Sequence, residues 1–501
     1  MLLTTSWMLD LGLISTLLLF LLYKYATRRF DYFKKRNVFY EKPLPFFGNF
    51  KDVVTLKTPI GEWFKKAYDN AKTPYFGIFL YDEPYFVIKD PDLIKRVMIR
   101  DFNNFSDRAV AYPEHNKVLS NFLFLMPNPE WKNFRSELSP AFTSGKLRMM
   151  FPIMQEVGER YQKYLFKNQG QLEAKEVSAK YATDVISKCF FGINAHCFDD
   201  ENAIFRVIGR QLFDFTLRNA FRQTAYFSLQ SIVKLFKINF FEDWITEYFV
   251  DSFNKVFHAR EQSNHRQNDF IDILKDMKRK DGSKGTFKME KIEGSGMQFF
   301  VAGLETTSST IAFTLHELCL NKSIQNRLRK EILDNIKENN GLTYDGVTEM
   351  KYLDMCIKET LRKYPLLPFM DRKTMNDYKL PETDVVIEKG MKVFIPIHGL
   401  HYDEKYFPEP DKYDPERFDG TINHNIDGLV YFPFGEGPRI CIGERFGLMS
   451  TKLALIHTLT KYEVDRCSKT PDPMVFAKKS LILQSEVGLP MTFRHLVPSS
   501  A

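Results

Sequence analysis

The chain has 501 residues, of which 44% are hydrophobic and 15% aromatic, including 47 phenylalanines. This composition excludes a disordered chain and supplies enough apolar surface for a large core and an apolar pocket. The formal net charge is only +7 at pH 7, and the chain carries no zinc-finger, helix-turn-helix or RNA-binding pattern, so no nucleic-acid partner is expected.

The six cysteines form no C-x-x-C pair and lie in apolar or helical stretches, at positions 189, 197, 319, 356, 441 and 467. This pattern differs from the disulfide framework of a small secreted protein. Five of these cysteines are therefore expected to be small buried side chains. Cys441 is the exception, because of the residues around it.

The first predicted element is an apolar helix from Trp7 to Tyr23, WMLDLGLISTLLLFLLY, followed by a run of Lys and Arg within residues 24–36. Its apolar residues favour insertion into a bilayer by more than Asp10, near one end, opposes it. No basic residues precede the helix and no small-residue cleavage site follows it, so residues 1–24 are expected to be an uncleaved signal anchor. The positive-inside rule then places the rest of the chain in the cytosol, at the endoplasmic reticulum membrane.

Residues 25–45 are predicted to be a basic juxtamembrane linker, stiffened at its end by the prolines of KPLPFFGN. No Gly/Ser-rich or Pro-rich linker divides the chain after this point. Residues 46–501 are therefore expected to form one large catalytic domain.

The body is predicted to be mainly α with small β-sheets. YFGIFLY and YFVI, on either side of a turn at DEP, predict a hairpin over residues 75–88 that leads into a helix at DLIKRVM. Helical periodicity dominates residues 177–335, and VVIEKGMKVFIPI, residues 385–397, predicts a second hairpin. The Pro-rich stretch 401–432 is expected to be a long irregular surface loop of the kind that is often functional.

A polar pair interrupts a long apolar helix predicted around QFFVAGLETTSSTIAFTLHEL, residues 298–318. The hydroxyl of Thr306 can bond back to the carbonyl of Ala302 and loosen the helix enough to admit water. With Gly303 leaving room for a diatomic ligand, Glu305 and Thr306 could pass protons to dioxygen. An ordinary helix with a polar stripe is the alternative.

Two further motifs have ordinary explanations when each stands alone. Trp131 and Arg135 have the i, i+4 spacing of any amphipathic surface helix. Glu359 and Arg362 share one face of a predicted helix, and such a pair is commonly a surface contact worth roughly a few tenths of a kcal/mol. Arg417, in the downstream sequence PERF, could instead complete a buried charge network with them.

The sharpest motif is FGEGPRICIG, residues 434–443, which precedes the helical run ERFGLMSTKLALIHTL. Gly435, Gly437 and Gly443 permit tight turns and the close approach of a flat cofactor. Backbone N–H groups at the start of the helix can stabilise a thiolate at Cys441. A Gly-rich turn that holds a buried cysteine by chance is the alternative.

The neighbours of Cys441 suit a haem-thiolate centre. Phe434 could shield the sulfur from water, and Arg439 is placed to pair with an anionic haem propionate. A thiolate ligand pushes electron density onto iron and favours O–O cleavage.

Together and in this order, the motifs resemble cytochrome P450, and the resemblance covers nearly the whole chain. It implies a cytochrome P450 fold with an N-terminal transmembrane anchor helix, haem b (iron protoporphyrin IX) as cofactor, and Cys441 as its axial metal ligand. It makes Glu305 and Thr306 the catalytic proton-relay pair, and Glu359, Arg362 and Arg417 a core charge network. Propionate contacts are implied for Trp131, Arg135, Arg372 and Arg439, and further cofactor contacts for Ala302, Gly303, Phe434 and Gly443.

The anchor, EKPLPFFGNF and MQFFVAGLETTSSTIAFTLHEL are most similar to insect microsomal members of the family that handle foreign compounds. The entry sequence departs from the family's commoner Pro-Pro-Gly-Pro form, which bears on the stiffness of the hinge and not on the chemistry. Because the acid–threonine pair is present, the resemblance favours monooxygenation over rearrangement of peroxides.

The resemblance implies electrons from NADPH by way of NADPH–cytochrome P450 reductase, with cytochrome b5 as a further donor. The implied substrates are lipophilic and include xenobiotics, plant toxins, insecticides and endogenous lipids. Two alternatives stay open: an isomerase or dehydratase of the same family, and a non-catalytic haem protein that binds a gas. Product formation that depends on NADPH and O2 distinguishes a monooxygenase from the isomerase or dehydratase. Turnover of any substrate distinguishes an enzyme from the gas-binding protein.

Overall fold

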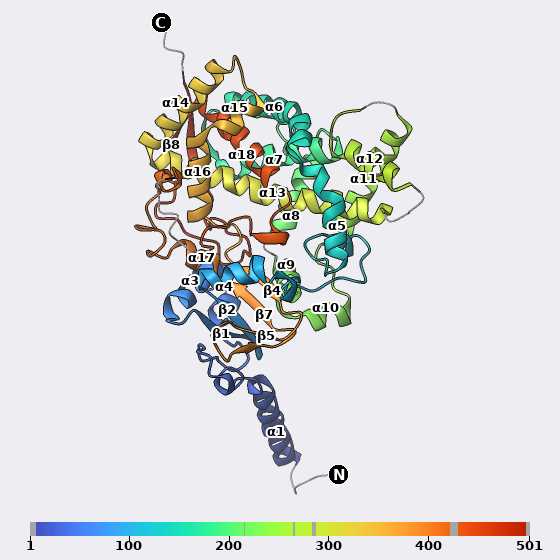
Figure 1. Ribbon diagram of the computed structural model, residues 1–501, viewed down its shortest axis with the longest axis vertical. Coiled ribbons are helices and arrows are strands. Elements are labelled where there is room, and N and C mark those ends of the chain that lie inside the picture. The colour runs from blue at the N-terminus through green and yellow to red at the C-terminus, as the bar shows by residue number, and fades with distance from the viewer. Residues whose placement is uncertain (1–6, 215, 264–265, 283–286, 421–428, 497–501) are drawn as a thin grey trace. The chain divides into compact units, whose positions relative to one another are not determined.

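The computed structural model describes residues 7–214, 216–263, 266–282, 287–420 and 429–496 (Figure 1). These residues form two compact units. The first unit contains residues 7–109, 368–400 and 429–430, and the second contains the other described residues. The chain passes between the units several times, which explains why no linker-like stretch marks their boundary in the sequence.

The first unit begins with the predicted apolar helix, α1 (Trp7–Thr27). The helix has 21 residues and is long and apolar enough to cross a membrane. Nearly all of its side chains are exposed, and in Figure 1 it projects as a separate rod. An exposed helix of leucines needs an apolar environment, so the structure is compatible with the predicted anchor.

The predicted first hairpin is confirmed. β1 (Tyr75–Leu80) and β2 (Glu83–Ile88) are antiparallel, with Leu80 opposite Glu83. They belong to a four-stranded sheet in the order β1-β2-β7-β4, in which β7 (Lys392–Ile395) is parallel to β2 and antiparallel to β4 (Met370–Lys373). Aromatic and β-branched residues dominate β1, β2 and β7 because they pack well on a pleated surface that is buried on both faces.

The predicted second hairpin is wrong. β6 (Val386–Ile387) pairs with β5 (Tyr378–Lys379) in a sheet of its own, whereas β7 joins the large sheet. The intervening turn is held by Thr374, whose hydroxyl donates to Glu388 O at 2.6 Å and whose carbonyl accepts from Gly390 N at 2.8 Å. Because this turn bonds to a third segment, the two strands cannot fold back on each other.

Part of the segment predicted as a linker packs on the large sheet. Arg28 Nε lies 2.8 Å from Asp82 Oδ2, and Tyr40 forms a parallel bridge with Gly77. Phe33 is only 1% exposed, with its ring centroid 5.3 Å from that of Phe79. Burial of this phenylalanine ties the segment to β1.

Short helices complete the first unit. They are η1 (Lys34–Arg36), α2 (Lys51–Val54), α3 (Ile60–Asn70), α4 (Pro91–Lys95), the π-helical turn η2 (Arg96–Arg100), η3 (Phe102–Asn104) and most of α17 (Ile397–His401). The helix predicted at DLIKRVM corresponds to α4 and η2. It begins after Asp90, whose carboxylate accepts from Leu93 N at 3.0 Å and caps the helix.

The second unit is mainly helical, as predicted. Its longer helices are α5 (Glu130–Leu138), α6 (Ser144–Lys167), α7 (Ala174–Phe191), α8 (Ile204–Phe213), α9 (Leu217–Ser228), α10 (Gln230–Phe236), α11 (Asp243–Gln262), α12 (Phe270–Asp281), α13 (Met289–Leu320), α14 (Lys322–Glu338), α15 (Tyr344–Glu349), α16 (Lys351–Lys363) and α18 (Glu444–Leu459). Its short turns are η4 (Leu119–Asn121), η5 (Ser139–Phe142), η7 (Pro415–Phe418) and η8 (Gly437–Arg439). A three-stranded antiparallel sheet runs β3 (Gly170–Glu173), β9 (Pro490–His495), β8 (Tyr462–Arg466).

The core of the second unit is built around α13, a helix of 32 residues that packs against α7, α16 and α18 (Figure 1). It is apolar on nearly all sides because neighbours surround it, which is the pattern of a buried core helix. Aromatic side chains fill the space beside it, for example the rings of Phe249 and Phe300, whose centroids lie 4.6 Å apart.

Glu359 and its partners form the core charge network that the resemblance implied, and the surface-pair alternative is wrong. The Glu359 and Arg362 side chains are both 0% exposed. Glu359 Oε1 lies 3.3 Å from Arg417 Nε and accepts from Asp414 N at 3.0 Å. Arg417 and Asp414, in the described part of the predicted irregular loop, thus complete the network.

Candidate functional site

The loop before α18 turns sharply at two glycines. Gly435 has φ +75° and Gly437 φ +71°, conformations that favour glycine, so their predicted role in tight turns is confirmed. Their role in the close approach of a cofactor stays a prediction. Cys441 N donates to Phe434 O at 3.0 Å and closes the loop. Gly443 differs, because its φ of −92° suits any residue and an added Cβ would meet no atom within 4 Å.

This loop leaves the Cys441 thiol exposed. Four other cysteines, at positions 189, 197, 319 and 356, are buried as expected, and burial raises the pKa of Cys319 to about 12. Cys467 is only partly buried, contrary to the expectation for it. It lies after β8, where its Sγ accepts from the Thr470 hydroxyl at 3.5 Å.

Two arginines and a tryptophan gather around this loop. Arg135, in α5, donates from Nη1 to Ile440 O at 2.9 Å. Arg439 Nη2 donates to Met126 O at 3.0 Å, and its guanidinium lies 4.2 Å from the centroid of the Trp131 ring. Burial lowers the pKa of Arg135, while the charge of Cys441 raises it. The structure therefore brings Trp131, Arg135, Arg439 and Cys441 together, and their contacts with a cofactor stay a prediction.

Part of one turn in the middle of α13 is exposed, although most of the helix is buried. Ala302 is exposed, and Gly303 and Thr306 are partly exposed, whereas the residues of the following turns, from Thr307 to Cys319, are buried. The predicted back-bond is confirmed, since Thr306 Oγ1 donates to Ala302 O at 2.7 Å. This turn presents a short apolar face with one hydroxyl oxygen that can still accept a hydrogen bond.

The small size of Gly303 serves helix packing. A Cβ at this position would lie 2.8 Å from Ile186 Cδ1 of α7, closer than a carbon contact allows. The glycine therefore lets α7 and α13 approach closely. Room for a diatomic ligand at Gly303 stays a prediction.

Glu305 is buried beside α7, only 6% exposed. Its Oε1 lies 2.8 Å from Lys175 Nζ and accepts from Gln484 Nε2 at 2.7 Å and from Ser309 Oγ at 3.2 Å. Neither Lys175 nor Gln484 was predicted, because each is more than a hundred residues from Glu305 in the sequence. A basic residue in the first turn of α7 carries no signal of its own in the sequence.

Arg372 lies in β4 of the first unit, 1% exposed. Its Nη1 donates to Asp371 O at 2.7 Å, whereas its Nε has no hydrogen-bond partner among the described residues. Burial first, and then the charge of Arg108, lower the pKa of Arg372 to about 9. A buried guanidinium with an unused donor fits an anion such as a propionate, but its contact with the cofactor stays a prediction.

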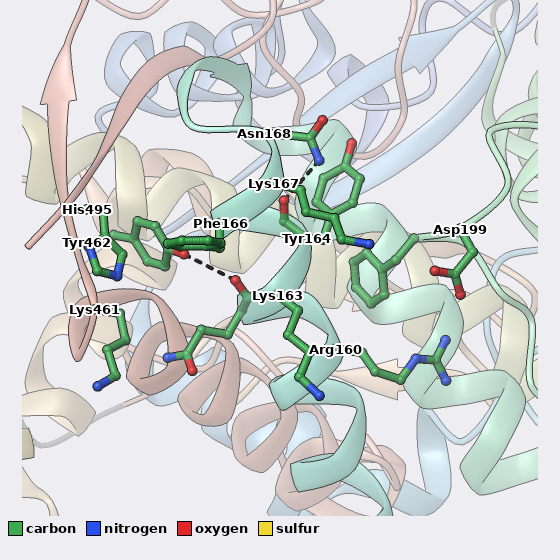
Figure 2. Close-up of a pocket in the computed structure, with 12 residues that line it drawn as sticks. Arg160, Lys163, Tyr164, Phe166, Lys167, Asn168, Asp199, Lys461, Tyr462 and His495 are labelled. Carbon is green, nitrogen blue, oxygen red and sulfur yellow. Dashed lines mark hydrogen bonds between the residues drawn. The ribbon is translucent and has the colours of Figure 1, made fainter.

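A cleft of about 530 Å³ lies elsewhere in the second unit, beside the C-terminal end of α6 and the start of β8 (Figure 2). Its lining includes Lys163, Lys167, Lys461, Phe166 and Tyr462, and the Tyr462 hydroxyl donates to Gln162 O at 3.2 Å. The lining contains none of the predicted site residues. The cleft is therefore separate from the Cys441 site.

The chemistry around Cys441 fits haem. An exposed thiol can hold the iron, the buried Arg439 and the partly buried Arg135 can neutralise the propionates, and an exposed apolar helix turn can lie against the flat ring. Among the described residues no group of three His, Cys, Asp or Glu side chains is placed to hold a metal ion. One exposed thiol beside two guanidinium groups is the donor set of a metal that a macrocycle carries and one protein thiolate holds.

Comparison with known proteins agrees with this chemistry. The cytochrome P450 family model matches residues 40–491. Cytochrome P450 6k1 of Blattella germanica is 42% identical over 493 residues, which cover 94% of this chain and 94% of that protein. Cytochrome P450 6j1 of the same organism is 36% identical over 474 residues, covering 93% and 94%. Probable cytochrome P450 6a13 of Drosophila melanogaster is 35% identical over 479 residues, covering 95% and 97%. With this match over nearly its whole length, the chain belongs to the cytochrome P450 family, whose members bind haem through a cysteine thiolate.

Proposed function

We propose that this protein is a membrane-anchored monooxygenase that inserts one oxygen atom of O2 into lipophilic substrates. Its electrons come from NADPH through NADPH–cytochrome P450 reductase, with cytochrome b5 as a further donor. Membership of the family supports haem monooxygenase activity. One observation supports assigning this activity to particular residues. The exposed Cys441 thiol lies in a closed loop, with Arg135 bound to the carbonyl of the preceding residue.

In this proposal Cys441 is the metal ligand, and the residues around it hold the cofactor. The haem, when bound, supplies the activation of dioxygen, which a thiolate ligand assists. Arg135, Arg439 and Arg372 neutralise the two propionates, because a buried guanidinium stabilises a carboxylate by charge and by paired N–H donors. The other proposed cofactor contacts are Trp131, Ala302, Gly303, Phe434 and Gly443.

Thr306 and Glu305 are the proposed proton relay. The Thr306 hydroxyl proton is used in the bond to Ala302 O, so its oxygen is left to accept a hydrogen bond from a water molecule. That water can pass a proton into the site, and Glu305 replaces the proton from solvent. In this relay Glu305 supplies the proton, and Thr306 positions the water that carries it.

The proposed substrates are lipophilic molecules such as xenobiotics, plant toxins, insecticides or endogenous lipids. The exposed turn of α13 offers Ala302 and Gly303 to a substrate, with Thr306 as its polar member. A pocket with apolar walls and few polar groups suits an apolar ligand.

The proposed location is the endoplasmic reticulum membrane, with a single anchor in residues 1–24 and the catalytic domain, residues 46–501, in the cytosol. The exposed apolar helix α1 supports the anchor. The basic residues of the joining segment, residues 25–45, support the cytosolic side.

The experiment is reconstitution of the haem-loaded protein with reductase, NADPH and ¹⁸O2 in the presence of lipophilic candidate substrates. A monooxygenase forms a product that carries one ¹⁸O atom and consumes NADPH. An isomerase or dehydratase instead forms product without NADPH and without ¹⁸O. A gas-binding haem protein binds CO and turns over nothing.

A further inference from the structure

The cleft beside the C-terminal end of α6 has three lysines in its lining (Figure 2). Lys163 and Lys167 lie four residues apart in α6, and Lys461 lies in the turn before β8. All three are exposed, and none of their ammonium groups has a hydrogen-bond or ion-pair partner among the residues that the structure describes. Like charges at the spacing of Lys163 and Lys167 repel each other on a helix. Helix stability therefore does not explain why these charges are gathered here, whereas an anionic ligand does.

The other charged groups of the lining leave this positive charge in place. Arg160 forms an ion pair with Asp184, which neutralises its charge. Asp199 is the one acid among the described residues that line the cleft, and its Oδ2 lies 3.7 Å from His196 Nδ1. Three lysines against one aspartate leave a net charge of +2. The cleft therefore attracts anions.

Aromatic rings form a wall beside the lysines, and in Figure 2 Phe166, Tyr462 and His495 lie together. The Tyr462 hydroxyl donates to Gln162 O at 3.2 Å and holds β8 against α6. The ring centroid of His495 lies 5.3 Å from that of Tyr462 and 5.4 Å from that of Phe166, both in edge-to-face geometry. Phe166 is nevertheless 57% exposed. An exposed ring that is held by its neighbours offers a surface on which a flat ligand can stack.

We propose that this cleft binds a phosphate ester that carries a flat ring, the chemistry of a nucleotide. Lysines bind phosphate as point charges, whereas a carboxylate is best recognised by the paired donors of an arginine. Arg160, the arginine of the lining, is committed to Asp184. The ring of the ligand stacks on Phe166, and its phosphate lies among the three lysines. The cleft volume of about 530 Å³ is within the usual range of small-molecule sites.

This site goes beyond the proposed oxygen chemistry and does not depend on it. Its lining shares no residue with the site around Cys441. Binding can therefore be measured without turnover, and a failure of either proposal leaves the other standing.

The test is calorimetric titration of the full-length, haem-loaded protein in detergent with adenosine monophosphate, adenosine or inorganic phosphate. The nucleotide should bind saturably and about tenfold or more tightly than adenosine or phosphate alone, because one molecule then uses both the aromatic wall and the lysines. Rising salt should weaken the binding of the nucleotide and of phosphate, and should leave that of adenosine unchanged.

Two kinds of variant separate the parts of the site. Phe166→Ala should weaken nucleotide binding by about fivefold or more and leave phosphate binding unchanged, since only the ring loses its partner. Lys167→Gln should weaken the binding of both by about threefold to fivefold. Lys461→Gln should do the same, which shows that the effect does not come from the end of α6.

The matched control is Lys337→Gln. Lys337 is an exposed lysine in the last turn of α14, so its loss removes the same charge from the same position in a helix as Lys167→Gln does. This variant should bind the nucleotide like the wild type. An unchanged reduced CO spectrum shows that each variant is folded and loaded with haem.

Three results would overturn the proposal. Phosphate that binds as tightly as the nucleotide, or nucleotide binding that Phe166→Ala leaves unchanged, would show that the cleft does not recognise a ring. Equal weakening by Lys167→Gln and Lys337→Gln would show that only the overall charge of the protein attracts the anion. Titrations without saturable nucleotide binding would show that no such site exists.

Discussion

Glu359 and Arg362 form a buried bidentate ion pair, with Nε to Oε2 and Nη2 to Oε1 both 2.8 Å. The remaining donors of Arg362 reach His401 O at 3.1 Å and Pro410 O at 2.8 Å. The pair therefore joins α16 to the irregular chain that follows α17. Both the carboxylate and the guanidinium have hydrogen-bond partners besides each other. A buried ion pair is stable only when its charges are satisfied in this way.

Replacement of Glu359 by Ala should reduce stability far more than activity per folded molecule. It leaves Arg362 and Arg417 without their carboxylate, and the loss of one partner of a buried pair costs about 3–5 kcal/mol. Folded yield and urea unfolding measure the effect. Asp345→Asn, which breaks the exposed bidentate pair with Arg148, is the matched control and should change little. Normal yield and full haem content in Glu359→Ala would show that the network does not hold the fold.

His457 should make the protein sensitive to mild acid. Burial lowers its pKa from 6.5 to about 4, and its Nε2 has no hydrogen-bond partner among the described residues. The unfolded chain binds the proton first, so stability is fully present above about pH 6.5 and is lost as the pH falls toward 4, by roughly 3 kcal/mol. His457→Phe should flatten the pH dependence of the unfolding midpoint in this window. Substitution of the exposed His258 is the control, and equal slopes in wild type and His457→Phe would contradict the prediction.

The exposed side chains of α9 to α11 should give residual membrane binding after deletion of residues 1–24. Leu235 is 74% exposed, Phe236 68% and Trp244 40%. Phe241, in the same region, is buried, with its ring centroid 6.2 Å from that of Phe122, and does not contribute to this surface. The truncated protein should sediment with lipid vesicles at low salt, and Leu235→Asp with Phe236→Asp should release it. Val475→Asp, at an exposed valine outside α9 to α11, should not release it. A truncated protein that stays wholly in the soluble fraction would rule out this contact.

Replacement of Thr306 tests the relay. Thr306→Ala should keep the haem spectrum and substrate binding, yet turn NADPH oxidation toward hydrogen peroxide, because the water that brings the proton loses its partner. Thr306→Ser keeps the hydroxyl and should stay coupled, and Thr306→Val keeps only the shape. Product and peroxide per NADPH are measured for all three. Coupling retained in the Val variant would mean that Thr306 only packs or bends α13.

Features that depend on residues close together in the sequence were predictable from the sequence alone. Gly435 and Gly437 turn the loop, and Thr306 bonds to a carbonyl four residues earlier in its own helix. The hairpin of β1 and β2 also formed as predicted, because its strands are adjacent and strongly apolar. Each of these features depends on short-range geometry.

Long-range partners were not predictable from the residues themselves. Lys175 meets Glu305 across 130 residues, and β7 leaves the expected hairpin because Thr374 holds the turn before it. Taken alone, the i, i+3 spacing of Glu359 and Arg362 is that of an ordinary surface pair. Family resemblance supplied that network, since a single sequence does not show which helix faces lie in the core.

The most direct test of the account is the reduced CO spectrum of the Cys441 variants. Cys441→Ala and Cys441→Ser should lose the thiolate-type band and all NADPH-dependent product, since each removes the sulfur that holds the iron. Cys356→Ala, at a fully buried cysteine of α16, should lower stability and keep the band. A thiolate-type spectrum that persists in Cys441→Ala would contradict the assignment of Cys441 as the ligand, and with it the site proposed around it.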